Sequence, residues 1–269
     1  MRIEKVIDSG TTRDFLNVTK VLYRGEGTWV CPLDKEIESI FDPKKNVYFK
    51  HGEACRWILK ENRGELIGRV AAFIDRKTAG KQDQPTGGMG FFECIKNQEA
   101  ANLLFDTARE WLRERGMEAM DGPINFGETD KYWGLLVDGF THPSYEIAYN
   151  FPYYRDLFEN YGFLTYFKQE GFHLDITEPL PPRFQKIAEW ISRKPDYEFK
   201  HFEWKKSDRF VEDFVTVFNE AWASFKENFQ PLEVSYIKKT LRKARAIIDE
   251  EFIWLAYHKG KPIAIYLMY

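Results

Sequence analysis

Glu93 is the side chain in this sequence best placed to act as a general base. It lies near the end of the apolar, strand-like run Met89–Ile95, where partial burial can raise a carboxyl pKa toward the working pH. A carboxylate there can take the proton from a nucleophile as the nucleophile attacks. The same position also suits a solvated or salt-bridged carboxylate, and the residue types leave both interpretations open.

Two further groups of residues could hold a small ligand. Asp121 and Asn125 bracket the pair Gly122-Pro123 at the end of a predicted strand, where the site of an α/β protein usually opens. The loop region 127–152 is rich in aromatic side chains with polar tips, which line many ligand pockets. The candidates in that loop are Trp133, Tyr149 and Asn150. A turn is the alternative for the first group, and core packing for the second.

Several other chemistries have no motif here. The histidines are scattered and the three cysteines form no zinc or disulfide pattern, so we predict no metal site. No nucleophile elbow or phosphate-binding glycine loop is present. The net charge of −3 gives no overall attraction to nucleic acid, and the basic cluster from Lys238 to Arg245 suits a solvated helix face. We therefore expect no nucleic acid partner.

Composition also predicts where the chain works. No stretch of about 18 apolar residues is present, so we expect no membrane-spanning segment and no membrane partner. The first residues lack the apolar core of a secretion signal. An odd number of isolated cysteines fits a reducing compartment, and we predict a cytoplasmic protein.

Hydrophobic patterning predicts the elements that would hold the candidate residues. The strands Cys55–Leu59 and Leu66–Ile74 form a hairpin, and the strand Met89–Ile95 follows. A helix over 98–115 has one apolar stripe, and Asn97 can cap its start. The chain is thus a mixture of helices and mostly antiparallel strands, an α/β (α+β) protein.

The region after the aromatic loop predicts a short helix and then more strand. Tyr153–Tyr161 has a helical pattern that Gly162 can close, and 163–176 is predicted to form a strand pair. Prolines at 179, 181 and 182 then interrupt the pattern. We predict a first domain over 1–178, a linker and helix over 179–198, and a second unit over 199–269.

The last predicted strand is unusual. The run Ile263–Tyr269 is apolar on both faces, as a central strand would be. We therefore expect the second unit to be incomplete here or to be completed by another chain. An exposed terminal strand favours edge-to-edge pairing, so we predict a homodimer through Pro262–Tyr269.

This order of elements resembles the GNAT superfamily of acyl-CoA-dependent N-acyltransferases. The resemblance rests on the hairpin 55–74, the strand 89–95, the helix 98–115 and the segment 157–163, which ends in Gly162-Phe163. Residues 252–269 echo the hairpin, as in uncharacterised tandem GNAT-like proteins. The resemblance implies a GNAT-like mixed sheet flanked by helices, followed by a second, partial GNAT-like unit.

The resemblance also implies a cofactor and a catalytic pair. Acyl-CoA, such as acetyl-CoA, would place its diphosphate at the start of the helix 98–115, where backbone N–H groups favour anions. The residues at that position are Asn97, Gln98, Ala100 and Ala101. This stretch lacks the glycines of the family's loop, and Glu99 adds a negative charge. Phe158 stands where the family has a general-acid tyrosine. Tyr154, one helical turn earlier, or Tyr161, next to the glycine, could replace it, and core packing is the alternative role for both. Glu93 would be the base, and of the two tyrosines we take Tyr154 as the catalytic candidate.

Two functions follow as hypotheses. The first is an N-acyltransferase that moves an acyl group from acyl-CoA to a small-molecule amine. The second is a catalytically inactive GNAT-fold protein that binds a small molecule or a partner, which the missing glycines and Phe158 favour. Transfer of an aminoacyl group from tRNA is a third interpretation, and the acidic balance argues against it.

Overall fold

The computed structural model describes residues 1–81, 83–127, 131–144, 147–223 and 231–268. The chain forms two compact units, Met1–Gln169 and Glu170–Tyr269, and each is described by itself.

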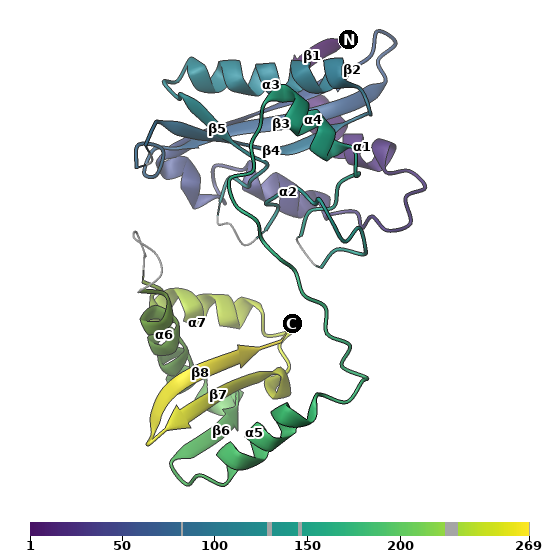
Figure 1. The fold of residues 1–269 in the computed structure, drawn as a ribbon. Coiled ribbons are helices and arrows are strands. Elements are labelled where there is room, and N and C mark those ends of the chain that lie inside the picture. The colour runs from purple at the N-terminus through teal and green to yellow at the C-terminus, as the bar shows by residue number, and fades with distance from the viewer. Residues whose placement is uncertain (82, 128–130, 145–146, 224–230, 269) are drawn as a thin grey trace. The chain divides into compact units, whose positions relative to one another are not determined.

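The first unit is built on a five-stranded mixed sheet (Figure 1). Its strands lie in the order β1-β2-β3-β4-β5, and they are β1 (Arg2–Lys5), β2 (Gly52–Lys60), β3 (Leu66–Asp75), β4 (Thr86–Cys94) and β5 (Ala119–Asp121). Neighbours from β1 to β4 are antiparallel, whereas β5 runs parallel to β4. The prediction of a mixed, mostly antiparallel sheet is confirmed.

Helices cover both faces of this sheet (Figure 1). α1 (Ser9–Leu22) and α2 (Asp34–Ile40) pack on one face, followed by a 3₁₀ turn, Val47–Lys50. α3 (Gln98–Arg113) and α4 (Tyr154–Tyr161) pack on the other face and enclose the larger core. The apolar stripe of α3 faces that core, and the Asn97 side chain caps its first turn by accepting from the Ala100 N–H.

A β-bulge in β4 decides which face each of its later side chains meets. Arg69 of β3 pairs with Glu93 and Ala71 pairs with Gly90, so two residues, Phe91 and Phe92, lie opposite one. Phe91 has a positive φ of 51°, a conformation that turns the strand. Because side chains alternate along a strand, the extra residue moves Glu93 from the α3 face to the α1 face.

The strand after α3, β5, has only three residues, and Gly122-Pro123 follows its end. Its parallel pairing with β4 covers only Thr86–Gly88, after which the chain turns away through Gly122-Pro123. A close approach of backbone to backbone holds the next residues: the Ile124 N–H donates to the Met89 carbonyl, and a Cβ on Gly90 would lie 1.9 Å from the Ile124 carbonyl oxygen. The second half of β4 therefore does not pair with β5, and α4 and the aromatic loop lie beside it instead.

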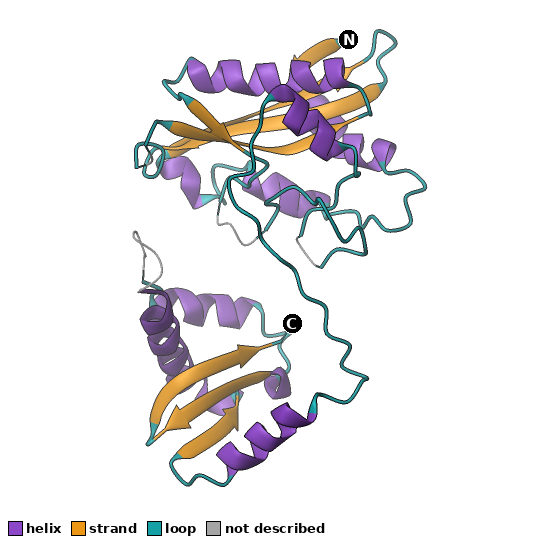
Figure 2. Cartoon of the chain, viewed as in Figure 1, coloured by secondary structure: helices purple, strands orange, loops and turns teal. Residues whose placement is uncertain are grey.

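The strand pair predicted over 163–176 is wrong. The chain from Phe163 to Pro181 contains neither helix nor strand (Figure 2). From Leu164 onward its large apolar side chains are exposed, with Leu164 and Phe172 each 90% exposed. The alternating pattern favours a strand, but a strand requires hydrogen-bonded neighbours, and this segment pairs with no strand among the residues that the structure describes.

The second unit repeats part of the first. After α5 (Pro182–Ser192), it contains the elements β6 (Tyr197–His201), α6 (Ser207–Ala223), α7 (Val234–Lys243), β7 (Ile253–His258) and β8 (Lys261–Leu267), with 3₁₀ turns at Trp204–Lys206 and Glu250–Phe252. The order strand, helix, helix, strand, strand is also that of β1, α1, α2, β2 and β3. The sheet order is β6-β7-β8, so among the described residues β8 lies at an edge of this sheet, where the expected exposed terminal strand would be. Tyr269 lies outside the described residues, and dimerisation through β8 stays a prediction.

Candidate functional site

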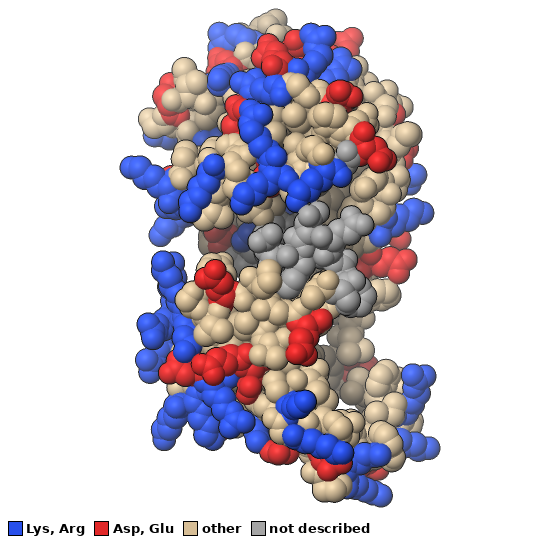
Figure 3. Space-filling model, turned by 90° about the vertical axis from the view of Figure 1, so that its left-hand side faces the viewer, with Lys and Arg blue, Asp and Glu red and all other residues tan. Residues whose placement is uncertain are grey.

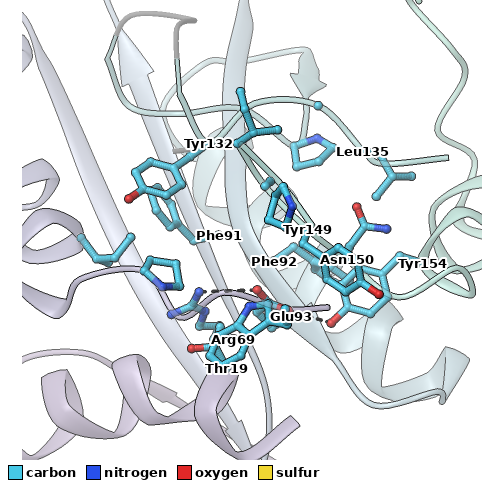
Figure 4. A pocket seen from close by; sticks show the side chains of 18 of the residues that line it. Thr19, Arg69, Phe91, Phe92, Glu93, Tyr132, Leu135, Tyr149, Asn150 and Tyr154 are labelled. Carbon is cyan, nitrogen blue, oxygen red and sulfur yellow. Dashed lines mark hydrogen bonds and ion pairs between the residues drawn. The ribbon is translucent and has the colours of Figure 1, made fainter. Parts of the chain in front are cut away.

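A cavity opens in the first unit beside the second half of β4, on the face covered by α1 and α2 (Figure 4). Its walls are mainly aromatic and aliphatic, with few polar groups, as is usual for small-molecule sites. Predicted site residues that line it are Glu93, Tyr149, Asn150 and Tyr154. Further lining residues that matter below are Trp29, Arg69, Phe91 and Tyr132.

Glu93 and Arg69 form an ion pair in the wall of this cavity. They are cross-strand partners, and the Arg69 Nη2 lies 3.6 Å from the Glu93 Oε1. Both side chains are almost wholly buried, at 8% and 4% exposed for the whole residues. The β4 bulge makes this pair, since regular alternation would turn Glu93 toward α3.

Two tyrosine hydroxyls converge on the other carboxylate oxygen. Tyr23, at the end of α1, and Tyr154, at the start of α4, each donate to the Glu93 Oε2 at 2.8 Å. The Tyr23 ring is held between Trp29 and Phe151, with ring centroids 4.9 and 4.5 Å away and nearly parallel planes. Elements from both ends of the first unit thus fix one carboxylate.

Burial sets the protonation behaviour of this cluster. Desolvation raises the pKa of the Glu93 carboxyl above its usual value, against the opposing effects of Arg69 and the two tyrosines. Desolvation, with the Glu93 charge next, raises the pKa of Tyr23 and of Tyr154 well above 10. Both hydroxyls are therefore proton donors at neutral pH, and Glu93 is a stronger base than a solvated carboxylate.

Arg69 holds a second set of contacts below the carboxylate. Its Nη1 donates to the Phe15 carbonyl at 3.0 Å, and its guanidinium lies 4.7 Å from the centroid of the Phe15 ring. Its Nε has no hydrogen-bond partner among the residues that the structure describes. Because the buried Arg69 guanidinium has little access to water, it depends on the Glu93 carboxylate to balance its charge.

The tyrosines at the start of α4 occupy the edge of β4 that β5 leaves unpaired. The Cys94 N–H donates to the Tyr154 hydroxyl at 2.9 Å, and the Tyr153 hydroxyl donates to the Cys94 carbonyl at 2.8 Å. Tyr154 thus accepts from the backbone and donates to Glu93. Because the hydroxyl oxygen accepts one of these hydrogen bonds, the Tyr154 proton points toward the Glu93 carboxylate.

The predicted cofactor residues lie at the start of α3. The Asn97 side chain takes the Ala100 N–H, and the Gln98 side chain donates to the Leu157 carbonyl of α4. The Ala100 and Ala101 side chains are fully buried in the core, so only their backbone could meet a ligand. An α-helix leaves the N–H groups of its first turn without partners inside the helix, so those of Gln98 and Glu99 are the ones that could meet a diphosphate.

The predicted substrate residues separate in the structure. Tyr149 and Asn150 line the cavity, whereas Asp121, Asn125 and Trp133 are not among its lining residues. The Asn150 side chain bonds both the N–H and the carbonyl of Leu136, at 2.8 and 3.0 Å, and so joins two parts of the loop. Its amide supports the cavity wall.

Sequence reasoning missed Tyr23 and did not give Arg69 a role. A signal for Arg69 was available, because it is the one charged residue in a strand, Leu66–Ile74, that is otherwise apolar. Such a residue needs a buried counter-charge. No comparable signal marked Tyr23, because the apolar pattern of its helix gives the last residue no special role.

The structure describes no group of three or more His, Cys, Asp or Glu side chains that could hold a metal ion in the ranges it covers. Within those ranges, no helix has the length and apolarity needed to cross a bilayer. Basic and acidic side chains are interspersed on the face shown in Figure 3.

No protein-family model matches the chain. It is 25% identical over 257 residues to the bacterial ceramide synthase of Caulobacter vibrioides (strain NA1000 / CB15N), covering 93% of this chain and 65% of that protein. It is 22% identical over 272 residues to Protein YghO of Escherichia coli (strain K12), covering 97% of this chain and 66% of that protein. The chain is thus a distant homologue of both and spans just under two thirds of their length.

Its solved structural neighbours include GNAT-fold acyltransferases. One is a GCN5-related glucosamine N-acetyltransferase region of a fungal multi-domain β-N-acetylglucosaminidase, with 11% identity and a TM-score of 0.48, covering 98% of this chain and 27% of that one. The likeness is one of fold alone.

Proposed function

We propose that this protein is an N-acyltransferase that moves an acyl group from acyl-CoA to a primary amine. The observation that carries the proposal is the 2.8 Å contact between the Tyr154 hydroxyl and the Glu93 carboxylate in the wall of the cavity. Aminolysis of a thioester is assisted by a base that takes the proton of the amine and by an acid that protonates the leaving thiolate, and this pair can supply both.

The proton balance closes within this pair. The amine nitrogen attacks the thioester carbonyl, a C–N bond forms, and Glu93 takes the proton that the nitrogen loses. The C–S bond then breaks, and the Tyr154 hydroxyl gives its proton to the leaving thiolate. Glu93 returns its proton to Tyr154 along their hydrogen bond, so both groups end as they began. Tyr23 and Arg69 hold the carboxylate during these transfers.

The named relative supports the amine as acceptor. A ceramide is a long-chain amino alcohol whose amine carries an acyl group, so its synthase joins an acyl group to nitrogen. The mainly apolar cavity wall supports a substrate with an aliphatic part next to the amine. Acyl-CoA as donor rests on the resemblance of the element order to the GNAT superfamily.

A second candidate, an inactive binding protein, is favoured by one specific observation. Tyr153 and Tyr154 already occupy the polar groups of Cys94 at the open edge of β4, and α3 begins without a glycine. A cofactor entering beside β4 would have to displace them. The two candidates differ in whether acyl-CoA binds and turns over.

Calorimetric titration with acetyl-CoA and with a longer acyl-CoA tests the first step. We expect binding at micromolar strength for one of them, about −8 kcal/mol. Thiol release is then followed with a panel of amines that includes a long-chain amino alcohol. No binding at millimolar acyl-CoA, together with no thiol release, would reject the enzyme and leave the binding protein.

Variants test the assigned roles once turnover is measured. Glu93→Gln and Tyr154→Phe should each lower kcat by about 10²–10⁴-fold, as the loss of acid–base catalysis does. Tyr161→Phe is the matched control, because it also lies on α4 but its hydroxyl bonds Asp106 rather than Glu93. Equal losses in all three variants would show damage to the helix instead.

A further inference from the structure

Helix α5 presents an apolar face that its own unit leaves uncovered. Every residue of the helix except Ile191 is exposed. Phe184, Ile187 and Trp190 are large apolar side chains with exposed fractions of 52%, 48% and 60%. Their spacing of three residues, with Ile191 one turn after Ile187, places them on one side of the helix.

A helix in this state lacks the contacts that normally stabilise one. Isolated helices shorter than about 12–15 residues are marginal in water, and α5 has 11 residues. Packing of an apolar face is what usually holds a helix of this length. We therefore expect the exposed face of α5 to meet a partner when the protein works.

The charges around this face indicate what kind of partner it meets. The helix and the two residues after it contain four basic side chains and one acidic one, namely Arg183, Lys186, Arg193, Lys194 and Glu189. The Lys194 Nζ lies 4.0 Å from the centroid of the Trp190 ring, so a cation sits beside the apolar surface. Aromatic anchors next to basic residues on one short helix are typical of helices that lie in a membrane interface.

We propose that α5 docks on the surface of an anionic lipid bilayer. Phe184, Ile187 and Trp190 would enter the region between headgroups and acyl chains, and the basic side chains would face the lipid phosphates. Two apolar side chains in the segment before the helix, Phe172 and Ile176, are also exposed, at 90% and 88%. The sequence-based expectation of no membrane partner rested on the lack of a long apolar stretch, and that does not bear on this proposal, because an interfacial helix lies in the plane of the membrane.

The test is flotation of the purified 269-residue chain with vesicles. One set contains phosphatidylglycerol and phosphatidylcholine in equal parts, and the other contains phosphatidylcholine alone. The chain should float with the anionic vesicles, and high salt should weaken this binding. The double variant Phe184→Ser with Trp190→Ser should lose it. The control Ile7→Ser with Val47→Ser removes two apolar side chains of the first unit that are 77% and 59% exposed, and it should keep the binding.

Charge reversal separates α5 from overall charge. Lys186→Glu with Lys194→Glu should reduce binding by more than Lys35→Glu with Lys205→Glu, which changes the net charge equally. Each basic side chain at an anionic surface is worth about fivefold in partitioning. Circular dichroism of every variant confirms that it is folded.

Three outcomes overturn the proposal. The first is that the chain does not float with anionic vesicles. The second is that it floats but the α5 variants bind as well as their controls. The third is that sedimentation shows a dimer that the Phe184→Ser, Trp190→Ser variant breaks, since a second copy would then cover the face. None of these readouts uses catalysis, so they are distinct from failure of the acyltransferase proposal.

Discussion

Replacing Tyr154 with Phe tests whether the buried cluster is held as described. The Tyr154 hydroxyl is a donor to Glu93 and the acceptor of the Cys94 N–H, and the residue is 1% exposed. A hydrogen bond to a charged group contributes about 1.5–3 kcal/mol, and a buried N–H left without a partner costs about 1–3 kcal/mol. Both effects come from one atom and overlap, so we expect the free energy of unfolding to fall by about 3 kcal/mol.

Two assays measure this effect. Urea unfolding of the full chain gives the loss in stability, with the two units fitted as separate transitions. Hydrogen exchange measured on peptides that contain Cys94 gives a local readout, because its amide loses the acceptor. Exchange there should speed up in Tyr154→Phe.

The control is again Tyr161→Phe, whose hydroxyl bonds Asp106 on the surface. Exposed hydrogen bonds of this kind rarely change stability by more than about 0.5 kcal/mol. A double-mutant cycle of Tyr154→Phe with Glu93→Gln should show a coupling energy of about 1 kcal/mol or more. If Tyr154→Phe costs no more than Tyr161→Phe, or the coupling is absent, the cluster geometry is refuted.

Three other changes probe the same region. The pKa of Glu93 is raised in the folded protein, so the folded state binds the carboxyl proton more tightly than the unfolded state does. The contribution of Glu93 to the free energy of unfolding is therefore greatest below about pH 4.5, and it is lost as the pH rises through the folded-state pKa. Urea unfolding at increasing pH from about 4.5 upward should show this decline in the native chain and a flatter profile, offset by the unpaired Arg69, in Glu93→Gln. Gly90→Ala would place a Cβ against the Ile124 carbonyl and should cost about 1–3 kcal/mol in the same assay; no loss would contradict that close approach. Tyr153→Phe frees the Cys94 carbonyl and, if acyl-CoA enters beside β4, should tighten its binding in calorimetry, whereas unchanged affinity would place the ligand elsewhere.

The elements that depend on neighbouring residues could be predicted from the sequence. The hairpin of β2 and β3, the cap at Asn97 and the end of α4 at Gly162 all matched, because periodicity, cap chemistry and the left-handed conformation of that glycine act over a few residues. The strand pair predicted over 163–176 is not formed, because strand pairing depends on residues far away in the sequence. The local pattern of this segment is correct for a strand.

The candidate site likewise contains residues that local sequence signals could predict and residues whose contacts depend on distant parts of the chain. Glu93 and Tyr154 were predicted separately and lie in contact. Tyr23 contacts Glu93 across 70 residues of sequence, and nothing in its own helix pattern indicates that meeting. Asp121, predicted to bind substrate, is the last residue of β5 and is not among the residues that line the cavity.

The bulge at Phe91–Phe92 connects the fold to the chemistry more directly than any motif does. Without it, alternation along β4 would point Glu93 at the apolar core under α3, where a carboxylate would have no cation, and would turn Phe92 toward Arg69. With it, Phe92 stacks on Phe105 at 4.5 Å and Glu93 meets Arg69. One added residue therefore places an apolar ring and an ionisable group each on the face that can accept it. Because two consecutive phenylalanines are compatible with either register, this step was not visible in the sequence, and the function proposed for Glu93 depends on it.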